Sequence, residues 1–223
     1  MSTDTFDRMD RMYRYQRHIY DLTRKYYLLG RDRLLRQLPV EADTRILEVA
    51  CGTGRNLSKL AARPERLWLY GLDASEPMLE TARRHLMKPL QTGRVVLKRE
   101  LAEQLDHRRT FGLDHPFDVV FFSYGLSMIP TWQAAVDAAL ANLRPGGSLF
   151  IVDFWDQGGW PRWFQALLRG WLRLFGVAHR PELLAYLTRL HETRIATLEL
   201  TPVARRYAYV ARLIKPTAAQ DSI

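Results

Sequence analysis

ILEVACGTGRN, residues 46–56, is the stretch that decides the fold of this 223-residue chain. Its first half is a short apolar strand with one acid, Glu48, and its second half is a tight glycine turn. Nineteen residues after Gly54, a second apolar run, 69–72, ends in Asp73. Glycine permits the positive φ angles and the close backbone approach of a ligand-binding turn. In a doubly wound α/β sheet two such strands lie side by side, which brings the turn and the acid to one crevice.

The residues around the turn favour one kind of nucleotide over another. A carboxylate at Asp73 suits a ribose diol, because both of its oxygens accept hydrogen bonds. A dinucleotide turn needs Gly-x-Gly-x-x-Gly, with the pyrophosphate at the start of the helix. Here Leu57 stands at the third glycine position, and Glu48 would repel a pyrophosphate. A nucleoside with a cationic amino-acid end avoids that repulsion and fits the pattern better than NAD.

Composition limits the class of protein. The one cysteine, Cys51, excludes a disulfide framework and a multi-cysteine zinc site, and we expect no metal. Because Cys51 lies inside the glycine turn, we interpret it as a small turn residue rather than a nucleophile. No signal peptide and no run of about 20 apolar residues is evident, so we expect a cytoplasmic protein. The net charge of +9 indicates an anionic partner, either nucleic acid or a membrane surface.

Hydrophobic periodicity predicts alternating strands and helices after a long first helix, and this order is typical of a parallel sheet. The first helix spans 6–38, and Gly30 ends or breaks it. The last eight residues, 216–223, are expected to fray. The expected strands are 45–50, 67–73, 94–99, 117–123, 148–154, 195–201 and 205–214, and the expected helices are 54–63, 75–88, 131–143 and a helical region at 160–192.

The glycine turn resembles the first motif of the class I S-adenosylmethionine-dependent methyltransferases, with Glu48, Gly52 and Gly54 in register. The resemblance implies a three-layer, Rossmann-like α/β fold with a mostly parallel seven-stranded sheet and an antiparallel last strand. It also implies S-adenosylmethionine as cofactor and S-adenosylhomocysteine as product. Residues 73–75 resemble the second motif, whose acid takes the ribose hydroxyls, and Met78 would lie under the adenine.

One part of the chain departs from that family pattern. Relatives usually carry Gly-Asp-Ala after the third strand, whereas this chain has Leu101 at the position of the acid. The backbone amide of Ala102 remains available to the adenine ring, and Glu100 or Glu103 is a possible substitute for the acid. The cofactor-binding residues predicted from the resemblance are Tyr26, Arg31, Glu48, Ala50, Cys51, Gly52, Gly54, Asn56, Asp73, Ala74, Met78, Glu100, Leu101, Ala102 and Ser123.

The segment 160–175 has one wholly apolar helical face. Trp160, Trp163 and Trp171 recur on it at helical spacing, and the arginines lie off that face. This pattern is typical of a helix in a membrane interface, with arginine toward anionic headgroups. A lid that packs the same stripe on the domain core fits equally well. A lid that also touches lipid satisfies both interpretations.

Four further runs, at 13–24, 28–32, 123–130 and 152–157, resemble the bacterial betaine-lipid N-methyltransferases, which convert diacylglyceryl homoserine to diacylglyceryl-N,N,N-trimethylhomoserine. The resemblance covers nearly the whole chain and implies three successive methyl transfers to one amine. The bacterial phosphatidylethanolamine N-methyltransferases are the nearest rival family. The lipid headgroup would be reached from the inner face of the cell membrane, with 160–175 and the basic first helix on the anionic surface.

The acceptor amine must lose a proton before it attacks the methyl group, and a nearby histidine or carboxylate can take it. Aromatic faces attract a growing methylammonium, and the acceptor carboxylate needs a cation, for which we consider the arginines of 14–31 or 205–206. Each candidate has a plain structural alternative, such as an exposed helix position, an ion pair or core packing. The predicted catalytic residues are Tyr13, His18, Tyr20, Asp21, Tyr124 and Asp153, with Tyr27 as a further aromatic wall.

The sequence disfavours two other functions. A nucleic-acid amino-methyltransferase usually has a polar Asn/Asp-Pro-Pro-Tyr/Phe motif after strand four. Residues 123–126, Ser-Tyr-Gly-Leu, lack it, so we expect no nucleic-acid partner. A non-catalytic membrane adaptor is disfavoured by the intact turn and Asp73. The expected parts are a helical cap at 1–40, the cofactor-binding core at 41–156, a helical lid at 157–193, and a closing hairpin with tail at 194–223; the sequence does not indicate the oligomeric state.

Overall fold

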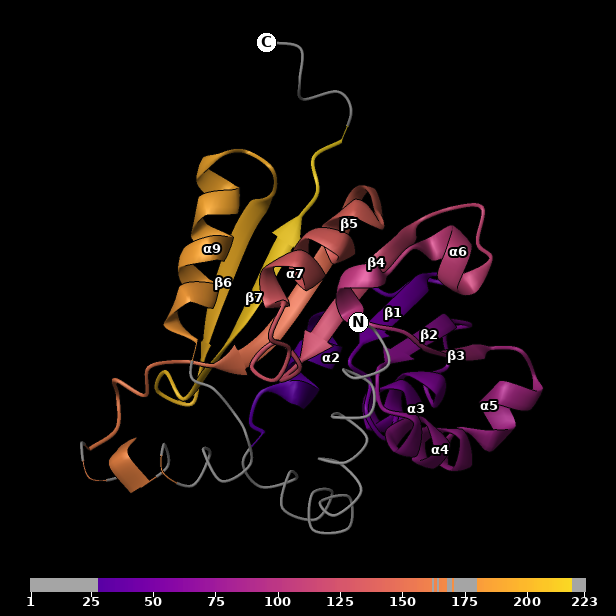
Figure 1. The fold of residues 1–223 in the computed structure, drawn as a ribbon, viewed down its shortest axis with the longest axis horizontal. Helices are drawn as coiled ribbons and strands as arrows, with labels where there is room; N and C mark the ends of the chain where they lie inside the picture. Colours follow the sequence, from indigo (N-terminus) through magenta and orange to yellow (C-terminus); the bar gives the residue numbers. More distant parts are fainter. Residues whose placement is uncertain (1–27, 162, 164, 168–169, 171–179, 218–223) are drawn as a thin grey trace.

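Seven strands form one sheet in the computed structural model, which describes residues 28–161, 163, 165–167, 170 and 180–217 (Figure 1). The strand order is β3-β2-β1-β4-β5-β7-β6, and β7 runs antiparallel to both of its neighbours while the other pairs are parallel. The predicted fold class is therefore confirmed. The strands are β1 (Arg45–Val49), β2 (Trp68–Asp73), β3 (Val95–Arg99), β4 (Phe117–Ser123), β5 (Leu143–Phe154), β6 (Thr197–Val203) and β7 (Ala208–Ile214).

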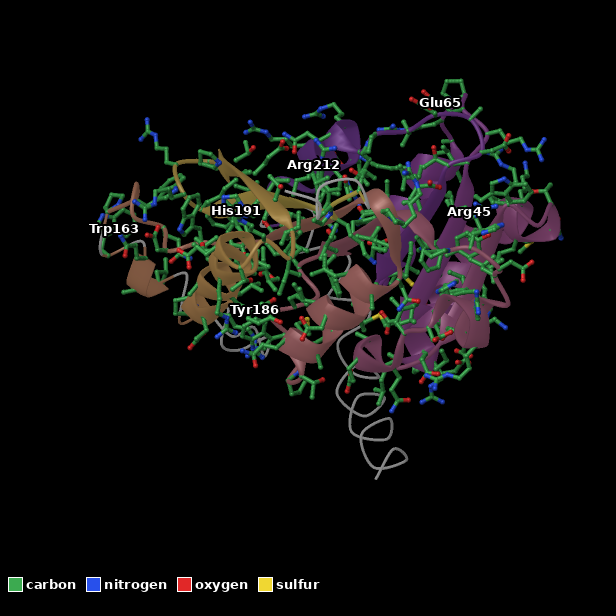
Figure 2. The ribbon with its side chains drawn as sticks, turned by 90° about the horizontal axis from the view of Figure 1, so that it is seen from above. Arg45, Glu65, Trp163, Tyr186, His191 and Arg212 are labelled. Carbon is green, nitrogen blue, oxygen red and sulfur yellow. The ribbon has the colours of Figure 1, made fainter. Side chains whose placement is uncertain are left out.

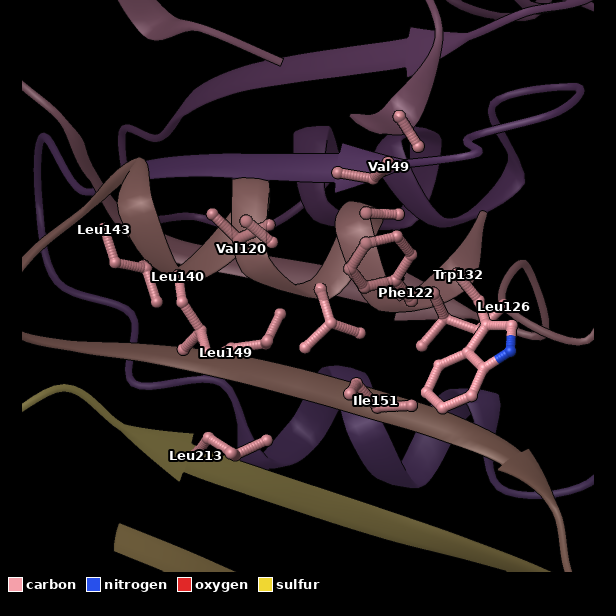
Figure 3. Close-up of a cluster of buried hydrophobic side chains, with 14 of the residues drawn as sticks. Val49, Val120, Phe122, Leu126, Trp132, Leu140, Leu143, Leu149, Ile151 and Leu213 are labelled. Atoms are coloured by element: carbon pink, nitrogen blue, oxygen red, sulfur yellow. The ribbon is translucent and has the colours of Figure 1, made fainter. Parts of the chain in front are cut away.

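Helices cover both faces of the sheet, because the central strands are apolar on both sides. One buried cluster joins α2, α3 and α4 to side chains such as Ile46 and Phe121. A second cluster, drawn in Figure 3, joins α7 and α9 to side chains such as Phe122 and Ile151 on the opposite face. The helices are α2 (Arg31–Gln37), α3 (Arg55–Ala61), α4 (Glu76–His85), α5 (Met87–Gln91), α6 (His107–Phe111), α7 (Trp132–Ala141), α9 (Pro181–Glu192) and the 3-10 turn η1 (Ala102–Gln104).

Several element boundaries differ from the sequence predictions. The predicted helix 75–88 divides at Leu86, where φ is −109° and the helical path is interrupted between α4 and α5. The predicted strand 148–154 begins earlier, because Leu143 already pairs with Phe117 before a register shift. The last strand begins at Ala208, since residues 204–206 all take positive φ and form the turn from β6.

The connection between β3 and β4 contains structure that the periodicity did not predict. The η1 turn comes first, and α6 follows with Asp106 as its N-cap, whose carboxylate accepts from the amides of Arg108 and Arg109 at 3.0 and 2.8 Å. This side-chain cap satisfies two of the amides that a helix start leaves without intrahelical partners. A five-residue helix is too short for its hydrophobic period to be visible in the sequence.

The α2 helix begins directly after a glycine. Gly30, with φ at +91°, directly precedes this helix. The remainder of the predicted first helix, up to residue 27, lies outside the described residues.

Across the described parts of the chain, no helix has the length and apolar character needed to cross a membrane. Within those same parts, no cluster of three or more histidine, cysteine or acidic residues is arranged to hold a metal.

Candidate cofactor-binding site

A cavity of about 660 Å³ lies where β1, β2 and β4 end, at the carboxyl edge of the sheet. Open α/β sheets bind their ligands at this edge, beside the point where the strand order reverses. Its volume is in the range that encloses a nucleoside-sized ligand. The lining residues are Leu28, Arg31, Glu48, Ala50, Cys51, Gly52, Thr53, Arg55, Asn56, Ser58, Lys59, Asp73, Met78, His85, Ser123, Tyr124, Gly125, Met128 and Ile129.

The glycine turn curls the chain from β1 into α3. Positive φ angles at Ala50, Gly52 and Gly54 (57°, 54° and 74°) produce the curl, and a β-carbon on Gly54 would stand 2.9 Å from Leu86 Cδ1. The amide of Cys51 donates to the Leu72 carbonyl at 3.0 Å, so the turn is also bonded to β2. The backbone of the turn is therefore held in the wall of the cavity.

Asp73 fixes this arrangement from the end of β2. Its Oδ2 accepts from the amide of Gly52 at 2.7 Å, and its Oδ1 accepts from the amide of Ser75 at 2.9 Å. Each carboxylate oxygen has a second lone pair, so the group can also accept from hydroxyls of a ligand in the cavity. The acid predicted to bind ribose thus has a second role in holding the glycine turn.

Glu48 is the deepest acid in the site, with 2% of its surface exposed. Its Oε1 accepts from Asn56 Nδ2 at 2.7 Å, while Oε2 has no hydrogen-bond partner among the described residues. Burial raises the pKa of this carboxyl to about 8, against the opposing effects of Asn56 and Arg31. A buried acceptor without a partner costs free energy unless a ligand supplies a donor. A cationic amino group is the donor that suits it best.

Cys51 is packed rather than poised for chemistry. Its side chain is buried, and a β-carbon on Gly71 would stand 3.0 Å from the Cys51 sulfur. Burial raises the thiol pKa well above its ordinary value, and the nearby Asp73 and Glu48 carboxylates add to that effect. The thiolate is the reactive form of cysteine, so this geometry agrees with the interpretation of Cys51 as a turn residue.

The end of β4 forms the opposite wall. Ser123 lines the cavity, and its hydroxyl has no hydrogen-bond partner among the described residues. Tyr124 follows with a positive φ of 59°, and its hydroxyl donates to the carbonyl of Leu29. Its ring packs on Phe154 with a centroid distance of 4.6 Å. Tyr124 therefore joins the wall of the cavity to the segment that leads into α2.

Asp153 lies elsewhere. It is buried, but it does not line the cavity, and its position in β5 alternates with Val152 so that it points to the face covered by α7 and α9. Its oxygens accept from the amides of Ser127 and Phe154 at 3.1 and 2.8 Å. The structure thus shows a positioning contact for the 124–127 loop at this predicted general base.

Of the residues predicted at the adenine, Met78 lines the cavity, whereas Glu100, Leu101 and Ala102 do not. Glu100 Oε1 accepts from the amide of Leu101 at 3.1 Å, and Ala102 packs in the second hydrophobic cluster. Ala74 accepts from Arg99 through its carbonyl and does not line the cavity. Six predicted residues lie outside the described part of the chain: Tyr13, His18, Tyr20, Asp21, Tyr26 and Tyr27.

Several lining residues were missed by the sequence reasoning. Arg55, Ser58 and Lys59 follow the glycine turn at helical spacing, which was an available signal. His85 had no such signal, because it reaches the turn from α4, where its Nδ1 lies 2.9 Å from the Thr53 carbonyl oxygen. The missed lining residues are Leu28, Thr53, Arg55, Ser58, Lys59, His85, Gly125, Met128 and Ile129.

Comparison with known proteins places this site in a family. Residues 46–147 match the family described as "Methyltransferase domain". A demethylmenaquinone methyltransferase of Clavibacter sepedonicus is 33% identical over 140 residues, which is 60% of this chain and 53% of that protein. The 27-O-demethylrifamycin SV methyltransferase of Amycolatopsis mediterranei is 32% identical over 123 residues, covering 55% and 43%. The chain thus spans about half the length of these curated relatives.

Solved structures share the fold at lower identity. The N-methyltransferase NodS of Bradyrhizobium japonicum aligns with a TM-score of 0.57 and 21% identity, covering 83% of this chain and 94% of that one. Phosphoethanolamine N-methyltransferase 2 of Haemonchus contortus, in complex with S-adenosylhomocysteine, aligns with a TM-score of 0.64 and 16% identity, covering 84% and 52%.

Residues 46–147, a little under half of the chain, thus match a methyltransferase domain, and the cofactor of this site is S-adenosylmethionine. The residues present fit that molecule. The buried Glu48 oxygen matches its ammonium group, and Asp73 at the head of β2 matches its ribose hydroxyls.

Proposed function

We propose that this protein is an N-methyltransferase that adds three methyl groups to the amine of a lipid headgroup, diacylglyceryl homoserine. The observation that carries the methyl transfer is the buried Glu48 oxygen beside the glycine turn, which suits the cationic amino-acid end of the methyl donor. When bound, S-adenosylmethionine supplies an electrophilic methyl group on its sulfonium. Holding donor and amine in line is then the main task of the protein.

The chain's own residues divide that task. Glu48 and Asp73 orient the donor, and the glycine turn supplies its backbone to the same wall. Ser123 and Tyr124, at the end of β4, form the wall opposite the turn. The Tyr124 ring, held by its hydroxyl bond to Leu29, presents an aromatic surface that attracts an amine as its positive charge grows.

Support for the lipid acceptor comes from one of the runs that resemble the betaine-lipid enzymes. Of the run 123–130, Ser123, Tyr124, Gly125, Met128 and Ile129 all line the cavity. This part of the resemblance is thus a wall of the site rather than a distant surface. Phosphatidylethanolamine, whose amine is also a headgroup amine, is the alternative acceptor from the rival family.

A quinone ring is a second candidate acceptor. The 33% identity to a demethylmenaquinone methyltransferase favours it, and the apolar lining residues Leu28, Met128 and Ile129 suit a ring as well as a lipid. Glu48 and Asp73 serve the donor in either case. The acceptor assignment therefore needs a direct comparison of substrates.

The test is transfer of labelled methyl from S-adenosylmethionine to three acceptors in mixed micelles, followed by mass spectrometry of the products. We expect a product that carries three methyl groups from diacylglyceryl homoserine, and little from phosphatidylethanolamine or demethylmenaquinone. Preferred methylation of either other acceptor would replace the homoserine assignment. Preferred labelling of RNA or DNA would remove the lipid assignment altogether.

We also propose that the protein works on the inner face of the cell membrane. Trp163 is 70% exposed and Leu167 is 67% exposed, and Figure 2 shows Trp163 at the periphery of the molecule. The exposed Arg205 lies against Gly159, shortly before these residues in the chain, since its carbonyl oxygen would stand 2.5 Å from a β-carbon on Gly159. Apolar side chains with an arginine nearby suit an anionic lipid surface.

The membrane proposal has a matched control. The double substitution Trp163→Ser and Leu167→Ser should reduce binding to anionic vesicles by about tenfold or more, because each large apolar side chain contributes about 1.5–3 kcal/mol when buried. Ile195 is 53% exposed and precedes β6, at the end of the sheet opposite the cavity. Ile195→Ser should therefore not change vesicle binding. Unchanged vesicle binding by the double variant in a sedimentation assay would contradict this surface.

A further inference from the structure

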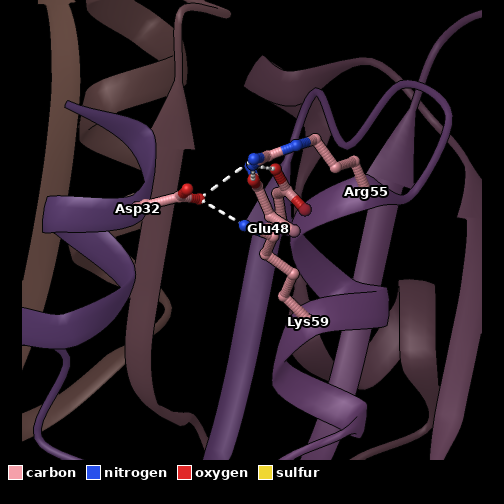
Figure 4. A network of polar contacts seen from close by, with 5 residues as sticks. Asp32, Glu48, Arg55 and Lys59 are labelled. Carbon is pink, nitrogen blue, oxygen red and sulfur yellow. Dashed lines mark hydrogen bonds and ion pairs between the residues drawn. The ribbon is translucent and has the colours of Figure 1, made fainter. Parts of the chain in front are cut away.

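A carboxylate sits between two cations at the mouth of the cavity. Arg55 Nη2 lies 3.0 Å from Asp32 Oδ1, and Lys59 Nζ lies 2.9 Å from the same oxygen (Figure 4). Arg55 and Lys59 line the cavity, whereas Asp32 approaches from α2 and does not. The two cations stand at i and i+4 on α3, which places their head groups side by side. They are therefore arranged to bind one carboxylate together.

This pair of cations is connected to the acid that receives an amino group. Arg55 Nη1 donates to Asn56 Oδ1 at 3.1 Å, and Asn56 Nδ2 donates to Glu48 Oε1 at 2.7 Å. Figure 4 shows Glu48 and the Arg55 guanidinium close together, with Lys59 on the same helix. A position that binds a cation, Glu48, and a position that binds an anion, Arg55, are thus connected through the single side chain of Asn56. An α-amino acid carries both complementary groups on one carbon.

Asp32 is a carboxylate that a ligand can replace. Partial burial acts to raise its pKa, but the bonds and charges of Lys59 and Arg55 outweigh that effect, so its pKa is lowered. The group therefore stays anionic at neutral pH. About half of its side chain is exposed, and exposed ion pairs contribute little to folding stability. Releasing Asp32 from its partners consequently costs the protein little.

We propose that Arg55 and Lys59 form a carboxylate-binding subsite at the mouth of the cavity, for which Asp32 competes with the carboxylate of an α-amino-acid ligand. Two ligands carry that group: the methionine part of the cofactor and the homoserine headgroup of the acceptor. The headgroup source rests on the proposed function, and the cofactor source does not. The sequence predicts an arginine of 14–31 or 205–206 for the acceptor carboxylate; Arg31 of that set lines the cavity, and Arg206 pairs with Asp156.

The test compares ligands that differ only in the carboxylate. For the cofactor, calorimetry on the full chain measures S-adenosylhomocysteine and its decarboxylated analogue, 5′-(3-aminopropyl)thioadenosine. For the acceptor, labelled-methyl kinetics measure KM for diacylglyceryl homoserine and for the matching 3-aminopropyl ether lipid. In the double variant Arg55→Gln, Lys59→Gln, we expect at least a tenfold loss for the carboxylated member of one pair and less than twofold for its partner.

The pair that responds identifies the source of the carboxylate. Equal losses for both members of each pair, or no loss in either pair, would overturn the subsite. If the native chain transfers no methyl to diacylglyceryl homoserine, the proposed function fails, while the cofactor pair still tests the subsite. In that case a cofactor pair that does not respond overturns the subsite as well.

Asp32→Asn supplies a change of opposite sign. Because the competitor loses its charge, the carboxylated ligand that responds above should bind about threefold more tightly, and its decarboxylated partner should not change. Asp43→Asn is the matched control. Asp43 forms an exposed ion pair with Arg66, at a distance of 3.2 Å, and neither residue lines the cavity. Weaker or unchanged binding in Asp32→Asn would show that Asp32 does not compete.

Discussion

Glu48 and Asp153 are two buried acids near the carboxyl edge of one sheet, and they show how differently the two faces of that sheet are used. Both are almost fully buried, and burial raises the pKa of each, to about 8 for Glu48 and about 7 for Asp153. Glu48 faces α3 and keeps one oxygen without a partner among the described residues. Asp153 faces α7 and α9, and backbone amides occupy both of its oxygens.

The comparison teaches that burial and a raised pKa do not identify a ligand-binding acid. The two regions differ in the hydrogen bonds of their acids. Backbone amides bind both oxygens of Asp153, whereas one oxygen of Glu48 is left for a ligand. Asp73 combines both conditions, because it holds Gly52 and Ser75 and also lines the cavity. Substitutions at the three acids should therefore separate stability from cofactor affinity.

Asp153→Ala should have the largest effect, and it should act on stability. The amides of Ser127 and Phe154 would lose their acceptor, and each buried donor without a partner costs about 1–3 kcal/mol, so we expect a loss of about 3 kcal/mol. Thermal denaturation followed by circular dichroism measures it. The folded fraction should bind S-adenosylmethionine with native affinity. A stable variant that binds no cofactor would reverse the roles of the two regions.

Asp73→Ala should affect both quantities. Loss of a charged hydrogen-bonding group should weaken S-adenosylmethionine binding by about 2 kcal/mol. The melting temperature should also fall, because the Gly52 amide loses its acceptor. Calorimetry and thermal melts on the same sample measure both. Native cofactor affinity in a folded variant would refute the assignment of the ribose to Asp73.

Glu48→Gln should affect affinity alone. The amide keeps the shape of the side chain and an acceptor for Asn56 but removes the charge, so cofactor binding should weaken by about 1.5 kcal/mol. The melting temperature should stay the same, because the variant keeps the bond to Asn56 and the Glu48 carboxyl is already mostly neutral in the unliganded protein at pH 7. If the variant instead melts early and binds cofactor normally, Glu48 belongs with Asp153 as a structural acid.

The pH dependence of binding is the smallest expected effect. Glu48, with a pKa of about 8, is mostly protonated at neutral pH, and an ammonium ligand prefers the ionised form. Cofactor affinity should therefore rise between pH 6 and 8 and then level off, and the whole rise should be less than about tenfold, because it cannot exceed the loss expected for Glu48→Gln. Glu48→Gln should abolish the slope and Asp153→Asn should retain it. A slope that survives in Glu48→Gln would assign the proton to another group.

Much of the fold could be predicted because its signals are local. The apolar runs that became β1, β2 and β4 lie within a few residues of their predicted ends. The position of Leu143 in β5 could not be predicted, because its pairing with Phe117 depends on a register shift between distant strands. The short α6 was missed for the opposite reason: its stability comes from one cap at Asp106 rather than from a repeated pattern.

The site also contains residues that the sequence predicts and residues that it does not. Glu48 and Asp73 were found because the strand–turn–helix pattern fixes where they lie. The ion pair of Asp32 with Arg55 and Lys59 was missed, because it depends on how α2 packs beside α3. The direction of Asp153 was not predictable either. Strand residues alternate between the two faces, and nothing near Asp153 in the sequence says which face holds the ligand.

The buried sulfur of Cys51 can report on local opening of the glycine turn through its rate of alkylation. Because the chain has one cysteine, any alkylation can be assigned to this atom without further engineering. A thiol packed against Gly71, with a raised pKa, reacts only after local opening exposes it and lets it ionise. The labelling rate of the unmodified protein thus counts how often the turn separates from β2, and its decrease on ligand addition measures how firmly a ligand holds them together.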